Sequence, residues 1–127
     1  MDTNFYENRK IPSNIESFIA DLTTIMGDNA GLLKNRIEIS GIKCVFLSFD
    51  GMASLAIMTP LVLNPLEEIE IRRATPYELK NHIKSKLILS TDSIECFTYG
   101  DLVRRLMSGF VFLFIDGTEG VLGYGIQ

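Results

Sequence analysis

Two uncharged apolar runs, each followed by an Asp-Gly pair, constrain the fold of this chain more than any other feature. They are VFLSFDG at 45–51 and VFLFIDG at 111–117. Apart from Ser48, apolar residues fill both alternating sets of positions, so neither run offers a polar face to water. We therefore expect strands over 42–49 and 110–115 at the centre of a sheet, with helices covering both of its faces.

The Asp-Gly pairs that end these strands allow two interpretations. Asp50 and Asp116 could form a carboxylate pair for acid–base catalysis or for binding Mg²⁺. Alternatively, Asp and Gly are favoured where a strand reverses, since Asp accepts backbone N–H bonds and Gly adopts positive φ. No nucleophile, base or phosphate-binding loop is recognisable beside either pair. The sequence therefore favours structural turns at Asp50, Gly51, Asp116 and Gly117, and predicts no enzyme activity, no cofactor and no metal.

The length and the charge of the chain limit its domain organisation and its partners. A chain of 127 residues is typical of one domain with a continuous core. The polar start, MDTNFYENRK, predicts a flexible arm over 1–12 and no signal peptide, which leaves a single domain over 13–127. The net charge is −4 and no basic stripe is present, which argues against nucleic-acid binding.

Capping motifs and apolar spacing predict the remaining elements. Ser13 and Glu16 form a capping box for a helix that ends at Gly27. Ser40-Gly41 is typical of a tight reversal between two strands. The expected order is one helix, two strands, three helices and two strands, which indicates an α+β (mixed α/β) fold with a central mixed sheet of about four strands. The three inner helices are expected at 53–66, 76–88 and 98–109, and the last strand at 121–126.

The 76–88 helix has the strongest start signal in the chain. Thr75, Pro76 and Glu78 combine a cap, a proline at the first helical position and a capping-box acid. Apolar residues at 79, 83 and 87 form one stripe. The lysines at 80, 84 and 86 are predicted to mark the solvent side of this helix.

Other reactive residue types lack the context that their chemistry needs. His82 has no metal-ligand spacing around it, and Ser48 lacks the Gly-x-Ser-x-Gly elbow of a hydrolase. Gly123-Tyr124-Gly125 is too short for a phosphate loop. Cys44 and Cys96 are too few for a disulfide framework and fit buried thiols in a reducing compartment, although one disulfide between them stays open.

Two segments are candidates for an interface. The stretch 52–66 holds no charged residue before Glu67, and either core burial or docking to a partner would explain it. Glycines in the last strand would let a helix or another chain approach its backbone. We expect an open edge along 121–126 and weak self-association through it. The candidate interface residues are Leu55, Met58, Leu61, Gly123 and Gly125.

The order of several short phrases resembles the A subunits of spore germination receptors, the GerA family. The phrases are an aromatic-rich strand ending in Phe49-Asp50-Gly51, the stretch Leu63-Asn64-Pro65-Leu66, a Leu-x-Ser-Gly stretch at 106–109, the run FLFIDG at 112–117 and a short returning strand. The resemblance covers roughly residues 37–127. Later family phrases, Arg-x-x-x-Glu-Pro and Gly-Pro-Arg-Glu-Gly-Phe, do not occur here, so the chain looks like the first subdomain of the soluble N-terminal region.

The resemblance implies a non-catalytic domain that acts in nutrient-signal transduction or in receptor assembly during germination of a sporulating bacterium. The implied partners are B and C subunits, a second subdomain and a membrane domain. Together they would form a membrane-associated complex in the inner spore membrane, with this soluble domain facing the spore core. An alternative function is a sensor domain that itself binds a small nutrient in a pocket with converging polar groups.

Overall fold

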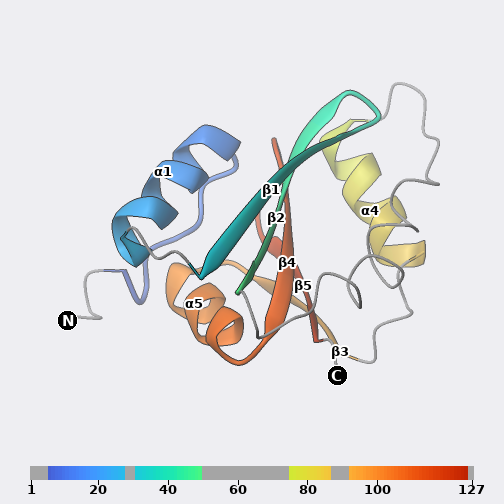
Figure 1. The fold of residues 1–127 in the computed structure, drawn as a ribbon. Coiled ribbons are helices and arrows are strands. Elements are labelled where there is room, and N and C mark those ends of the chain that lie inside the picture. The colour runs from blue at the N-terminus through green and yellow to red at the C-terminus, as the bar shows by residue number, and fades with distance from the viewer. Residues whose placement is uncertain (1–5, 28–30, 50–74, 87–91, 126–127) are drawn as a thin grey trace.

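The computed structural model describes residues 6–27, 31–49, 75–86 and 92–125, which form three helices and five strands (Figure 1). The chain is therefore an α+β domain, as the sequence predicts. The elements are α1 (Ile15–Met26), β1 (Leu32–Ile39), β2 (Ile42–Phe49), α4 (Pro76–Lys86), β3 (Asp92–Cys96), α5 (Tyr99–Met107), β4 (Phe110–Ile115) and β5 (Val121–Gly125).

The five strands form one sheet in the order β1-β2-β4-β5-β3. All pairs between these strands are antiparallel, so the prediction of a mixed sheet of about four strands needs correction. The additional strand is β3, where the sequence analysis places no element. Its five residues, DSIEC, include only two apolar side chains, too few to show a clear strand pattern.

Helices cover both faces of this sheet, which confirms the expectation from the two apolar runs. α1 and α5 pack on one face and α4 lies on the other (Figure 1). β2 and β4 pair directly, with Val45 opposite Phe114 on the α1 side and Phe46 opposite Leu113 on the α4 side. All four side chains are buried because each strand contributes alternate residues to two cores.

The predicted hairpin turn and the predicted helix caps occur in the structure, with one correction at the start of α1. Ser40 and Gly41 both adopt positive φ in the β1–β2 hairpin, and Thr75 and Glu78 form the reciprocal capping box of α4. In α1 the cap is Asn14 rather than Ser13, because the Asn14 side chain accepts the Ser17 N–H at 3.0 Å. Glu16, which the sequence assigned to the capping box, instead pairs with Arg36 of β1.

Residues 6–12 pack against the domain, although the sequence analysis includes them in a flexible arm. Tyr6 and Ile11 are buried in the core on the α1 side. Ile11 N–H donates to the Phe97 carbonyl at 2.9 Å, and Tyr99 N–H donates to the Arg9 carbonyl at 3.0 Å. This segment therefore continues the hydrogen bonding beyond the end of β3.

The predicted open edge at 121–126 is wrong, because β5 lies between β4 and β3. Gly123 faces Phe112 on one side and Ile94 on the other. A Cβ atom at this position would lie 2.5 Å from Phe112 Cε1 and 3.0 Å from Ile94 Cγ1. The glycine therefore serves close packing within the sheet, and the expected self-association loses its structural basis at this strand.

Several predictions concern residues outside the described ranges. They are the helix at 53–66, the turn at Asp50 and Gly51, and the interface candidates Leu55, Met58 and Leu61. No helix in the described part of the chain is long and apolar enough to cross a membrane.

Candidate functional site

The Asp116-Gly117 turn holds the start of α1 against the end of β4. Asp116 Oδ1 accepts the Ile15 N–H at 2.9 Å, and Gly117 N–H donates to the Ser13 carbonyl at 2.7 Å. Gly117 adopts φ +91°, a conformation that favours glycine. The Asp116 carboxylate therefore caps a helix that lies about a hundred residues earlier in the chain. Asp50 lies outside the described residues, so its position relative to Asp116 is not described.

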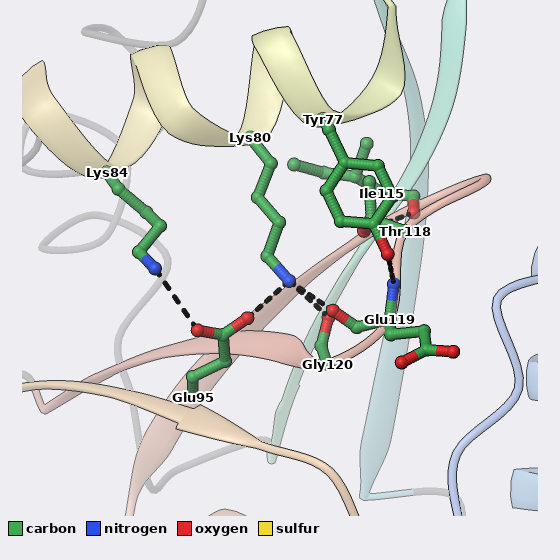
Figure 2. Close-up of polar contacts among 8 residues, drawn as sticks. All are labelled: Tyr77, Lys80, Lys84, Glu95, Ile115, Thr118, Glu119 and Gly120. Atoms are coloured by element: carbon green, nitrogen blue, oxygen red, sulfur yellow. Dashed lines mark hydrogen bonds and ion pairs between the residues drawn. The ribbon is translucent and has the colours of Figure 1, made fainter.

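Lys80 of α4 is buried, which corrects its assignment to the solvent side of the helix. Only 3% of the residue is exposed, and its ammonium group points toward β3 and the β4–β5 turn (Figure 2). It donates to the backbone carbonyls of Glu119 and Gly120, the latter at 3.1 Å, and it pairs with the Glu95 carboxylate. Three acceptors thus meet the three N–H donors of the ammonium group.

Lys84, one turn along α4, reaches the same carboxylate from solvent. Its Nζ lies 3.2 Å from Glu95 Oε1, and about half of its side chain is exposed (Figure 2). Burial acts to raise the pKa of Glu95, but hydrogen bonds and charges from both lysines outweigh burial and lower this pKa below its ordinary value. We call Lys80, Lys84, Glu95 and the carbonyls of 119 and 120 the Lys80 cluster.

The backbone around the Lys80 cluster is held in place by further contacts. Tyr77 accepts the Glu119 N–H at 3.0 Å through its hydroxyl oxygen (Figure 2). Gly120 adopts φ +83°, and a Cβ there would lie 2.7 Å from Glu95 Oε2. The Lys80 cluster therefore connects three segments that are distant in sequence, namely α4, β3 and the β4–β5 turn.

The described residues contain no group of three His, Cys, Asp or Glu side chains that could hold a metal ion. His82 is half-buried on α4. Ser48 is buried in β2, and its hydroxyl has no hydrogen-bond partner in the described part of the chain. None of these side chains lies in an arrangement that we can assign to a reaction.

The two cysteines lie in different cores. Cys44 belongs to the core on the α4 side and Cys96 to the core on the α1 side. Both thiols are free. Burial raises the pKa of Cys44 to about 12, with a further contribution from Asp116, and raises the pKa of Cys96 to about 11. The sheet thus separates the two thiols. The disulfide between Cys44 and Cys96, which the sequence alone could not exclude, is not formed.

We expect both thiols to react slowly with a thiol reagent in the folded chain. The thiolate is the reactive form, and both pKa values lie well above neutral pH. Dithionitrobenzoate at pH 8 should label neither cysteine rapidly until urea unfolds the chain, after which two equivalents should react within the mixing time. Fast labelling of the native chain would contradict the buried positions, and a Cys44→Ser variant would identify the reactive residue.

Comparisons with known proteins give a match to a solved structure. No protein-family model matches the chain, and no curated protein matches it. The structure is similar to the crystal structure of the N-terminal domain of the A subunit of the Bacillus megaterium spore germinant receptor GerK3, with a TM-score of 0.71 and 16% sequence identity. The match covers 94% of this chain. This chain has the fold of about half of that receptor domain.

The fold similarity agrees with the resemblance to germinant-receptor A subunits that the order of phrases in the sequence indicates, because the similar structure is a domain of such a subunit. Because the sequence identity is only 16%, the match shows a shared fold and nothing more. The chain corresponds to 49% of the length of the GerK3 domain, so the chain spans about half of it.

Proposed function

We propose that this chain is a non-catalytic framework domain of a spore germinant receptor A subunit, which acts in receptor assembly or in transduction of the nutrient signal. The observation that carries the proposal is the fold shared with the GerK3 A-subunit domain over 94% of the chain. The phrases at 49–51, 63–66, 106–109 and 112–117 support it independently, because they follow the order found in the same family.

The contacts of two charged side chains, Asp116 and Lys80, support a structural role. The Asp116 carboxylate accepts a backbone N–H at the start of α1, and the Lys80 ammonium is saturated by one carboxylate and two backbone carbonyls. A catalytic group must reach a substrate, whereas these groups contact the main chain of their own domain. In this proposal their task is to fix the relative positions of the helices and the sheet.

The proposal includes partners and a location. The partners are B-type and C-type receptor subunits, a second N-terminal subdomain and a membrane domain of the A subunit. The assembly lies in the inner spore membrane with this domain on the spore-core side. Leu55, Met58 and Leu61 remain the predicted docking residues, whereas Gly123 is occupied within the sheet.

Deletion of residues 13–127 from the gene in the encoding bacterium tests the proposal. Spores that carry the deletion should release dipicolinate slowly or not at all after nutrient addition, and the full-length gene should restore release. An affinity tag on the intact protein should recover B-type and C-type subunits from detergent-solubilised spore membranes. Normal nutrient-triggered release by the deletion strain, or a tagged protein confined to vegetative cells, would contradict the proposal.

A further inference from the structure

β1 forms one edge of the sheet (Figure 1). All eight of its residues lie in register with β2, and within the described ranges no residue outside β2 forms a backbone hydrogen bond with β1. The opposite edge strand, β3, has only five residues, and the segment from Arg9 to Ile11 continues the hydrogen bonding beyond its end. β1 is therefore the longer of the two edges, and a long edge is a template for a further strand.

The described helices lie away from the outer side of β1. Phe18 of α1 stacks on Phe114 of β4 with ring centroids 4.3 Å apart, which places α1 over the middle strands. On the other face, Lys80 ties α4 to β3 and to the β4–β5 turn. Arg36 of β1 reaches back to Glu16 of α1 through its side chain alone. A second strand could therefore approach β1 without meeting either helix.

The hairpin geometry decides which backbone groups of β1 point outward. Ser40 and Gly41 adopt φ 53° and 80° and form a two-residue loop closed by the Ile39–Ile42 pair. In such a hairpin the closing pair exchanges both hydrogen bonds, and hydrogen-bonded pairs then alternate with non-bonded ones. The even-numbered residues of β1 therefore direct their N–H and C=O groups away from β2. They are Leu32, Lys34, Arg36 and Glu38.

The charges on these outward residues restrict which strand can pair with β1. Opposite charges placed directly across a strand pair stabilise it, and like charges destabilise it. In an antiparallel pair of two β1 strands, several registers oppose two lysines, two arginines, two glutamates, or Lys34 and Arg36. Only one register opposes unlike charges and avoids every like pair. It places Arg36 of each copy opposite Glu38 of the other.

Both faces of the joined sheet are complementary in this register. On the α1 face, Glu38 lies between Lys43 of its own hairpin and Arg36 of the second copy, so charges alternate across the contact. On the α4 face, Ile37 of one copy lies opposite Ile37 of the other. Ile37 is half-buried and packs against the core on that side, so the apolar surface continues across the contact.

We propose that β1 pairs antiparallel with β1 of a second copy of this chain, with Arg36 opposite Glu38, so that two sheets join into one. About four backbone hydrogen bonds form between the outward groups of the two Arg36–Glu38 pairs. The contact is two-fold symmetric and uses β1 of both copies, so it closes at a dimer. Its small area makes the dimer weak and concentration-dependent. This inference does not depend on a role in a receptor.

Sedimentation equilibrium of the 127-residue chain tests the dimer. From about 10 μM to about 1 mM, the range in which weak complexes dissociate, the average mass should rise from that of a monomer toward that of a dimer and no further. Amide exchange of Arg36 and Glu38, followed by NMR, should slow over the same range because their N–H groups become donors. A monomer at every concentration, or association without slower exchange at these two amides, would overturn the proposal.

Charge reversals test the register. Glu38→Lys and Arg36→Glu each oppose like charges twice per dimer, so each alone should weaken dimerisation at least about tenfold. An equimolar mixture of the two variants should associate again, because the introduced lysine then faces the introduced glutamate and one natural Arg36–Glu38 pair remains. Glu119→Lys makes the same charge change on the exposed β4–β5 turn and should leave the association unaltered.

Two outcomes of the charge reversals would contradict the register. One is undiminished association of Glu38→Lys. The other is a mixture that stays monomeric although both variants keep native circular-dichroism spectra. Should either variant fail to fold, the amide exchange of the natural chain decides whether β1 is the contact.

Discussion

Replacing Lys80 by Met should lower the free energy of unfolding by about 3–5 kcal/mol, the usual cost of removing one partner from a buried ion pair. Methionine keeps most of the apolar length of lysine, so the loss reports the ammonium group rather than packing. Without that group, the Glu95 carboxylate and the carbonyls of Glu119 and Gly120 lose their buried donor. Urea unfolding followed by circular dichroism measures the change.

Lys84→Met is the matched control for this prediction. Lys84 lies one turn along α4 and carries the same charge, but its side chain is about half exposed. Its replacement should therefore lower the free energy of unfolding by at most about 1 kcal/mol. The double variant Lys80→Met/Glu95→Gln should recover part of the loss, because it also removes the uncompensated buried charge. Equal and small effects of the two lysine substitutions would show that Lys80 is solvated and that the Lys80 cluster does not hold α4.

Gly123→Val should lower the free energy of unfolding by about 2–3 kcal/mol. Valine favours strands, so the substitution would be neutral or stabilising on an open edge. In the interior of the sheet, the added methyl groups meet Phe112 and Ile94, since even a Cβ atom would lie 2.5 Å from the Phe112 ring. Overpacking of this kind costs about 1–3 kcal/mol and occasionally more. Urea unfolding again provides the measurement.

A second substitution tests the reason for the Gly123 effect. Phe112→Leu shortens the side chain that lies opposite Gly123 in the β4–β5 register. Gly123→Val should therefore cost less in the Phe112→Leu background than in the natural chain, which gives a favourable coupling energy. A neutral effect of Gly123→Val together with zero coupling would restore the interpretation of β5 as an edge strand.

Signals within a few residues were enough to predict much of the fold. The capping box at Thr75 and Glu78, the hairpin at Ser40-Gly41 and the end of α1 at Gly27 all occur as expected, because each depends on local backbone geometry. The burial of 44–49 and 111–115 on both faces followed from their apolar composition. The cap of α1 was misplaced by one residue, since Ser13 and Asn14 are both favoured caps.

Features that depend on distant partners were not predicted from the sequence. β3 has a weak strand pattern, and without it β5 kept only β4 as a neighbour, so one missing strand led to the false open edge. Lys80 directly follows Leu79, which belongs to the apolar stripe of α4. Its hydrogen-bond acceptors, however, come from β3 and the β4–β5 turn. Nothing in the α4 sequence indicates them, so the Lys80 cluster appears only when the chain is folded.

The most direct test of a structural role for the Asp-Gly endings is an Asp116→Asn substitution in the full-length protein of the encoding bacterium. Asparagine keeps a side-chain oxygen that can accept the Ile15 N–H, and it removes the carboxylate charge. The structural account predicts nutrient-triggered dipicolinate release at the natural rate and an unfolding free energy of the isolated chain within about 1 kcal/mol of the natural value. A variant that folds normally but releases no dipicolinate would show that the carboxylate itself acts in the function.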